Sequence, residues 1–278
     1  MGSNLKDDIV YIQEWMKKDP QLPEPFDDGV TRMFLHCTYY SLEQTKKCIE
    51  RFCTDRHNMP QIYMDRDPMD KNIELAHNLH DAACYSCGDF DIFFFRLGDD
   101  LDNFDLQDAC KALSLKVDAF IKEVHRIAEN HVVVVDVKTV SIKHLPKLNL
   151  VLLKNYIIYL LESMPVRIKK IFVINAPPIT DMFYNLIKPV LSQNVIEIID
   201  ICADDTNLKK YVDTKTLPTD YGGEALNLCD SSYDMWDDVL KNREMFLDNN
   251  LWKGDASMIP MKTDVNTMNG SFRTLSID

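Results

Sequence analysis

Apolar residues in the first part of the chain recur every three to four positions, which is the spacing of one buried face on an amphipathic helix. The predicted helices cover Leu5–Met16, Asp28–Cys37, Ser41–Phe52 and Asp70–Tyr85. Three prolines at positions 20, 23 and 25 separate the first two helices, because proline removes a backbone donor and interrupts a helix. The pattern predicts a small helical bundle over residues 1–88.

After Gly88 the pattern changes to short apolar runs that alternate with longer amphipathic segments. The predicted strands are Phe90–Leu97, His131–Val137, Lys170–Ala176 and Val195–Cys202. The predicted helices between and after them are Leu106–Ile127, Leu145–Met164, Ile179–Leu191 and Tyr233–Asn249. Strands joined through helices imply crossover connections, hence a mostly parallel sheet and an α/β fold. We expect this α/β domain to cover residues 89–256, and a polar, extended tail to cover residues 257–278.

The segment Val166–Leu191 combines a buried strand, a tight corner and an oily helix. Pro177 and Pro178 end the strand, since neither can donate a ladder hydrogen bond. The helix that follows has a wide apolar face, and Pro189 is expected to kink it. Such a segment is consistent with ordinary core, and equally with the wall and lid of an apolar cavity.

Composition and charge narrow the classes of protein. The chain has 278 residues, of which 46% are hydrophobic and 27% charged, as in a folded globular protein. Its net charge of −13 disfavours binding to nucleic acid and loose adsorption to anionic membranes. No apolar run is long enough to span a membrane, and the N-terminus lacks a signal-peptide core. We therefore expect a cytoplasmic protein whose eight cysteines stay reduced.

The usual signatures of enzymes are missing from the sequence. The eight glycines form neither a dinucleotide fingerprint nor a phosphate-binding loop, and there is no Gly-x-Ser-x-Gly elbow. Asp136, Asn175 and Asp200 stand at predicted strand ends without a histidine or serine beside them in sequence. We expect no catalytic activity, although a constellation assembled only by folding stays open as an alternative.

One set of residues has the chemistry of a zinc site: His77, His80, Cys84 and Cys87. On the predicted helix these side chains would share one face, with the outer two about 15 Å apart, which is too far for one ion. Packing of this face against the bundle is the preferred interpretation. We expect neither a metal ion nor a cofactor.

Several motifs resemble those of the CRAL-TRIO lipid-binding family. Ile174-Asn175-Ala176-Pro177, with an apolar helix ending in Ile187-Lys188-Pro189, is similar to that family's gate region. Leu217–Gly223 (LPTDYGG) is similar to its LPxEYGG segment, with Asp220 in place of glutamate. The following smaller matches also fit: Phe34-Leu35, Leu42-Glu43, Lys46, Ser141 and His144. The tail Gly270–Arg273 looks like the branch most similar to alpha-tocopherol transfer protein.

The resemblance implies a helical domain followed by an α/β domain that holds one hydrophobic small molecule behind a movable gate. It implies a carrier that transfers a tocopherol, retinoid, carotenoid or similar isoprenoid between membranes. By position, the implied cavity-lining residues are Leu113, Val117, Val135, Ile142, Leu160, Met164, Ile179, Phe183, Leu186 and Ile187. A phospholipid or phosphoinositide exchanger of the same fold and a non-enzymatic protein-interaction adaptor stay open as alternatives.

In similar family members, basic residues beside the gate bind phosphoinositide headgroups. The residues here that keep this character are Arg167, Lys169, Lys170 and Lys188. Asn194 and Ile198 stand where two further basic residues would be expected. We therefore expect transient, peripheral membrane contact, with phosphoinositide binding only partly supported.

Overall fold

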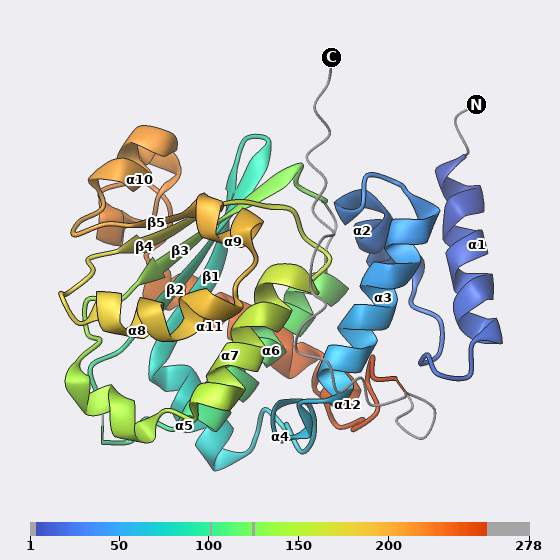
Figure 1. The fold of residues 1–278 in the computed structure, drawn as a ribbon, viewed down its shortest axis with the longest axis horizontal. Helices are drawn as coiled ribbons and strands as arrows, with labels where there is room; N and C mark the ends of the chain where they lie inside the picture. The colour runs from blue at the N-terminus through green and yellow to red at the C-terminus, as the bar shows by residue number, and fades with distance from the viewer. Residues whose placement is uncertain (1–3, 101, 124–125, 255–278) are drawn as a thin grey trace.

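The computed structural model describes residues 4–100, 102–123 and 126–254. Its N-terminal part is helical and consists of α1 (Leu5–Lys18), α2 (Asp28–Cys37), α3 (Leu42–His57) and α4 (Pro60–Tyr63). The side chains of Asn4, Asp27 and Ser41 cap the first three helices by accepting backbone N–H hydrogen bonds. Figure 1 shows α1–α3 grouped at one side of the molecule, with the sheet on the other side of α7.

Five strands form one sheet in the order β1-β2-β3-β4-β5. They are β1 (His80–Cys87), β2 (Phe90–Leu97), β3 (Asn130–Asp136), β4 (Ile168–Ile174) and β5 (Ile199–Ile201). β1 and β2 are antiparallel, and the remaining neighbours are parallel. The expected α/β fold with a mostly parallel sheet is confirmed.

Two predicted elements were wrong. The helix predicted over Asp70–Tyr85 ends at Asn78 as α5 (Lys71–Asn78), and the chain continues as strand β1. Pairing with the aromatic-rich strand β2 outweighs the local helical pattern, and Gly88, at a φ of +63°, forms the turn between them. The first half of the strand predicted over Val195–Cys202 belongs instead to helix α9 (Gln193–Ile198), and only the three residues of β5 form a strand.

The boundary predicted at residue 88 stays a prediction. Strand β1 lies before that position but pairs along its whole length with β2, so by its hydrogen bonds it is part of the sheet. The tail expected over residues 257–278, with its Gly270–Arg273 match, lies outside the described residues.

The two faces of the sheet are covered by different helices. Alternate residues of the strands point to opposite faces. Ile92, Phe94, Val132 and Val134 pack toward α10 (Thr206–Tyr211) and the chain that leads from it to Leu228. The opposite face, which carries Phe93 and Phe95, looks toward α6 (Leu106–Lys122) and α7 (Leu150–Glu162).

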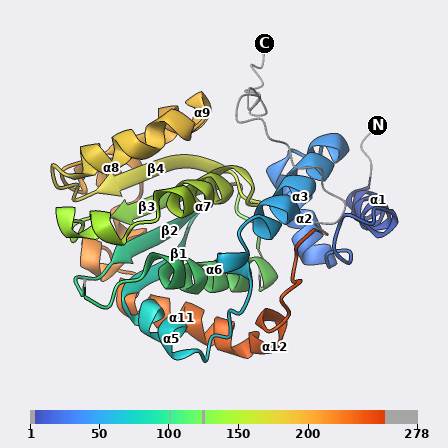
Figure 2. The same cartoon turned by 60° about the horizontal axis from the view of Figure 1, so that its bottom comes forward.

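The remaining helices complete the edges of the domain. They are α8 (Thr180–Ile187), α11 (Leu228–Lys241), α12 (Arg243–Phe246), and the 3₁₀ turns η1 (Ile142–Lys147), η2 (Lys188–Val190), η3 (Thr214–Thr216) and η4 (Thr219–Tyr221). Figure 2 shows α8 and α9 together on the side of the molecule opposite to α5 and α11. None of the helices in the described part of the chain combines the length and apolar character needed to cross a bilayer.

Polar residues at the carboxyl ends of the strands have partners in the LPTDYGG segment and in the loop that follows β4. Asp136, at the end of β3, accepts hydrogen bonds from the Asn175 amide at 2.9 Å and from the Tyr221 hydroxyl at 3.0 Å. Asp220 forms an ion pair with Arg96 and also accepts the backbone N–H of Leu228. Through these contacts of Asp220 and Tyr221, the LPTDYGG segment is held against the carboxyl ends of β2 and β3.

Candidate ligand-binding cavity

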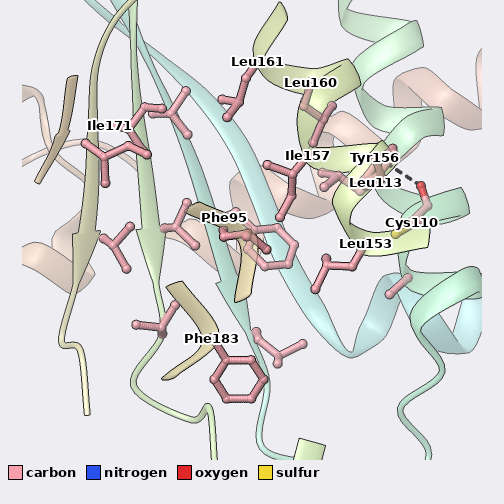
Figure 3. A pocket seen from close by; sticks show the side chains of 18 of the residues that line it. Phe95, Cys110, Leu113, Leu153, Tyr156, Ile157, Leu160, Leu161, Ile171 and Phe183 are labelled. Atoms are coloured by element: carbon pink, nitrogen blue, oxygen red, sulfur yellow. Dashed lines mark hydrogen bonds between the residues drawn. The ribbon is translucent and has the colours of Figure 1, made fainter. Parts of the chain in front are cut away.

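A cavity of about 460 Å³ lies between the sheet and helices α6, α7 and α8. Figure 3 shows side chains from α6 and α7 on one side of it, including Leu113, Leu153 and Leu160, facing Phe95 and Ile171 of the sheet. Phe183 of α8 borders the same space. This volume lies in the range of small-molecule sites, and its walls are almost entirely hydrocarbon.

The period of the strands explains why the cavity floor is apolar. In β2 the alternate residues Phe93 and Phe95 face the cavity, and in β3 the alternate residues Val133 and Val135 do so. Because both strands are apolar on both faces, one set fills the core behind the sheet while the other set lines the cavity. A second set of walls comes from α7, which is apolar over most of its circumference.

Eight of the ten residues proposed from the sequence border the cavity: Leu113, Val117, Val135, Leu160, Met164, Phe183, Leu186 and Ile187. Two do not. Ile142 is 57% exposed, because it begins η1 with its side chain in solvent while His144 of the same turn is buried. Ile179 precedes the first residue of α8, and the helix presents Thr180 to the cavity in its place.

Sequence reasoning missed many cavity residues, which are spread over strands β2–β5 and helices α6 and α7. Leu153, Tyr156 and Ile157 border the cavity, but an all-apolar helix gives no indication of which side faces a ligand. His131 could have been found, because it stands two residues before Val133 and so shares the face of that side chain.

Few polar atoms reach the cavity. The hydroxyl of Tyr156 donates to the carbonyl of Cys110 at 3.2 Å and lies 2.8 Å from the Ser114 hydroxyl, so its bonding capacity is used. The ring nitrogens of His131 and the Thr180 hydroxyl do not open onto the cavity, because protein atoms enclose them. The His131 ring lies against the backbone of Arg167. Burial, and to a lesser extent the neighbouring His36 and Arg126, lowers the pKa of His131 to about 4. The ring is therefore neutral at physiological pH.

Helix α8 is loosely held by the rest of the domain. It starts after Pro177-Pro178, passes into η2 at Lys188-Pro189, and Thr180 is its only buried residue. Its cavity side carries Phe183, while Met182 is 39% exposed on the outside. An apolar helix with both sides partly exposed has the properties of a lid.

The four basic residues near this lid differ in their availability. Arg167 donates to the carboxylate of Glu129 and to the carbonyl of His36, and its guanidinium lies 3.8 Å from the ring centre of Tyr39. Lys170 is half-buried, with its ammonium 5.7 Å from the Phe172 ring. Lys169 and Lys188 are exposed. Arg167 is thus occupied by contacts within the protein, whereas the last two lysines face solvent.

The set of His77, His80, Cys84 and Cys87 does not converge. His77 stacks on Trp236 with ring centres 4.2 Å apart, and Cys84 and Cys87 point to opposite faces of β1. Across the described ranges, no group of three or more histidine, cysteine, aspartate or glutamate side chains is arranged to hold a metal ion.

One pair outside the cavity has the chemistry of a nucleophile and a base. The Lys116 ammonium donates to the Ser232 hydroxyl at 2.6 Å, and burial lowers the pKa of Lys116 to about 7. The Ser232 hydroxyl also accepts the backbone N–H of Ala82, and its side chain is 1% exposed. No substrate reaches a hydroxyl enclosed in this way, so the pair is structural.

Comparison with known proteins identifies the class of this cavity. Residues 91–223 match the family model for the CRAL/TRIO domain, and residues 2–73 match the model described as Pinta-like, UBA domain. Residues 91–223 therefore form a CRAL/TRIO domain, which confirms the resemblance seen in the motifs of this chain.

Several proteins that are similar in sequence to this chain are named alpha-tocopherol transfer protein-like. The Homo sapiens protein is 22% identical over 224 residues, which cover 78% of this chain and 65% of that protein. The Mus musculus protein is 21% identical over 84% of this chain and 68% of its own length. Clavesin-2 of Homo sapiens is 25% identical over 62% of this chain and 51% of its own length. The matched part of this chain thus spans about two thirds or less of these relatives.

The fold also occurs among solved structures. The crystal structure of Sfh5 superposes with a TM-score of 0.53 over 87% of this chain and 100% of that chain, at 13% sequence identity. This likeness concerns the fold alone.

Proposed function

We propose that this protein is a lipid carrier that holds one hydrophobic small molecule, such as a tocopherol, retinoid, carotenoid or other isoprenoid, and transfers it between membranes. The observation that carries the proposal is the cavity of about 460 Å³, whose walls are almost wholly apolar. An apolar cavity of this size stays unfavourable for water, because its walls offer few hydrogen bonds. A hydrocarbon ligand gains free energy by leaving water for such walls.

We also propose that the residues expected from the sequence to contact the ligand do so where they border the cavity, on α6, β3, α7 and α8. Phe183 and Ile187 would close over the ligand, and Leu113 and Leu160 would contact it from the helices opposite the sheet. Among the described residues, no aspartate, glutamate, lysine or arginine lines the cavity. This lining suits a neutral isoprenoid better than a phospholipid, whose charged headgroup needs polar partners. A binding function without catalysis is the simplest account of these walls.

Contact with a membrane would help the lid to open. Moving Phe183 and Ile187 from the cavity into water would cost roughly 3–6 kcal/mol, at about 1.5–3 kcal/mol for each side chain. A bilayer interface accepts the same side chains and reduces this cost. Met182, Ile142 and Val151 are exposed on elements that border the cavity, and they give the protein an apolar surface for such contact.

Phosphoinositide contact is proposed for Lys169 and Lys188 only. Both are exposed, and headgroup phosphates attract such ammonium groups. Arg167 already neutralises Glu129, and Lys170 is half-buried, so these two contribute less to the surface charge.

Native mass spectrometry of the protein as purified, followed by organic extraction, tests the function. The proposal predicts a single co-purifying neutral lipid bound in a one-to-one complex. A diacyl phospholipid would favour the exchanger instead. A protein that is empty and binds no isoprenoid when one is added would contradict the carrier and favour the adaptor.

A further inference from the structure

The turn between α2 and α3 carries two exposed tyrosines in an unusual backbone conformation. Tyr39 and Tyr40 are 66% and 48% exposed, and their φ angles are +54° and +60°. These angles lie in the left-handed region, which glycine adopts freely and bulky residues seldom adopt. The turn itself uses only backbone atoms. The N–H of Tyr39 donates to the carbonyl of His36 at 3.0 Å, and the N–H of Tyr40 donates to the carbonyl of Leu35 at 2.7 Å.

Glycine would end α2 with the same two hydrogen bonds and less strain, so the backbone of the turn gives no reason for two aromatic rings. The rings are nevertheless held in place from one side. The Arg167 guanidinium lies 3.8 Å from the centre of the Tyr39 ring, and the His36 ring meets the Tyr40 ring edge-on at 6.1 Å between centres. Exposed tyrosines with a fixed orientation are typical of contact surfaces, because they bury a large area at a low cost in side-chain entropy.

An exposed cation lies beside the two rings. Lys169 follows Arg167 by two residues, which places it about 7 Å further along the start of β4. The Arg167 side chain is 9% exposed and pairs with Glu129, so it adds little charge to the surface, whereas Lys169 faces solvent. Tyr39, Tyr40 and Lys169 are referred to below as the tyrosine surface.

The chemistry of this surface matches the headgroup region of a bilayer. We propose that the tyrosine surface is a second membrane contact, separate from the lid, which places both rings among lipid headgroups and Lys169 beside an anionic phosphate. This inference rests on the carrier function proposed above. Tyrosine suits that depth because its ring is apolar and its hydroxyl is polar. A lysine close to the membrane adds attraction to anionic lipids.

A contact apart from the lid has a clear use in ligand transfer. Helix α8 begins beyond the carboxyl end of β4, and the tyrosine surface lies at the amino end of that strand. At about 3.3 Å per residue, the length of β4 separates the two by roughly 20 Å. The membrane contacts of α8 change when the lid moves, but those of the tyrosine surface do not. The protein therefore stays on the membrane while the cavity opens.

Co-sedimentation of the full-length protein with phosphatidylcholine vesicles, with and without phosphatidylserine, tests the surface. In the double variant Tyr39→Gly/Tyr40→Gly, vesicle binding should fall about tenfold on both compositions. The melting temperature should stay close to that of the wild type, because glycine relieves the left-handed backbone and offsets the lost ring contacts. Neither tyrosine borders the cavity, so affinity for Nile red bound inside it should be unchanged.

The matched control is Tyr233→Ser. Tyr233 is 49% exposed on α11, on the side of the molecule opposite to α8 in Figure 2, and its loss should leave vesicle binding unchanged. The variant Lys169→Gln isolates the charge. It should bind phosphatidylcholine like the wild type and lose about fivefold in affinity for vesicles that contain phosphatidylserine.

A second readout keeps an aromatic ring in the turn. In Tyr39→Trp, vesicles with brominated acyl chains should quench the fluorescence of the introduced indole, beyond any quenching of the wild-type protein. This measurement reports contact with lipid directly and does not depend on a loss of binding.

Each outcome decides a separate statement. Wild-type vesicle binding by the glycine variant, or no added quenching in Tyr39→Trp, would overturn the membrane contact and indicate that the rings bind a partner protein. A wild-type protein that binds neither kind of vesicle would overturn it as well. Native mass spectrometry reads the carrier function independently, so a protein that holds a neutral lipid but fails these tests loses the second contact and remains a carrier.

Discussion

At the scale of single residues, the second glycine of the LPTDYGG segment is required by a close backbone approach. A Cβ atom built on Gly223 would lie 1.9 Å from the carbonyl oxygen of Leu217 and 2.6 Å from that of Thr214. Both obstacles are backbone atoms, which cannot rotate away as a side chain does. The segment therefore has a structural reason for glycine that is independent of any ligand.

Substitution of Gly223 by alanine should destabilise the fold. We expect the free energy of unfolding to fall by about 1–3 kcal/mol, as for other overpacked sites, when measured by urea denaturation. Gly29→Ala is the matched control, because Gly29 is in a helix and its nearest obstacle is a side-chain oxygen at 3.4 Å. The control should be neutral or stabilising by up to about 1 kcal/mol. Equal destabilisation of both variants would contradict this reading.

The sequence predicts some residues of the cavity better than others. Phe183, Leu186 and Ile187 follow from the helical period of a motif that is recognisable on its own. Ile142 and Ile179 do not border the cavity because they stand at the first position of η1 and just before α8, and the first residue of a helix is hard to fix from a sequence. His131 is visible only once the phase of its strand is known.

At the scale of elements, the sequence likewise predicts some strands and misses others. The buried strands Phe90–Leu97 and Asn130–Asp136 were predictable, because apolar β-branched and aromatic runs of that length have few alternatives. Strand β1 was not, since its alanines and cysteines are compatible with a helix and only pairing with β2 makes them a strand. A short strand such as β5 likewise depends on its neighbour β4.

Helix α8 and the two elements beside it carry a prediction about membrane contact. Met182 on α8, Ile142 on η1 and Val151 on α7 are 39%, 57% and 69% exposed. Replacing all three with glutamine should reduce binding to phospholipid vesicles, as measured by co-sedimentation, by about tenfold. The expected reason is the loss of apolar surface available for insertion between headgroups.

The control for this variant lies elsewhere on the molecule. Leu240 of α11 is also 39% exposed, on the side opposite to α8 in Figure 2, and Leu240→Gln should leave vesicle binding unchanged. None of the four residues borders the cavity, so affinity for the ligand should be preserved throughout. A triple variant that binds vesicles like the wild type would show that this surface is not the docking face.

At the scale of the whole molecule, a buried ionic cluster joins the N-terminal helices to the cavity domain. Asp118 of α6 pairs with Arg56 of α3 at 2.6 Å and with Arg66 at 2.5 Å, and all three side chains are at most 1% exposed. Burial alone would raise the pKa of Asp118, but the two guanidinium groups lower it below its ordinary value. The carboxylate is thus charged and shared between both parts of the chain.

Asp118→Asn should therefore destabilise the entire protein. It leaves two buried guanidinium groups without a counter-charge, and loss of one partner from such a cluster costs about 3–5 kcal/mol. Asp67→Asn is the control, since it removes a partly exposed pair with Arg243 and should cost less than about 1 kcal/mol. Thermal unfolding of both variants tests this prediction. Similar melting temperatures would show that the Asp118 cluster does not hold the two parts of the chain together.

The central claim is that the cavity delivers its ligand by opening at a membrane. Its most direct test is the rate at which bound retinol, followed by its fluorescence, moves to acceptor vesicles as their concentration is raised. The lid predicts slow release into buffer and a transfer rate that rises in proportion to vesicle concentration, because contact lowers the cost of exposing Phe183 and Ile187. A rate independent of vesicle concentration would mean release through water and would contradict the account.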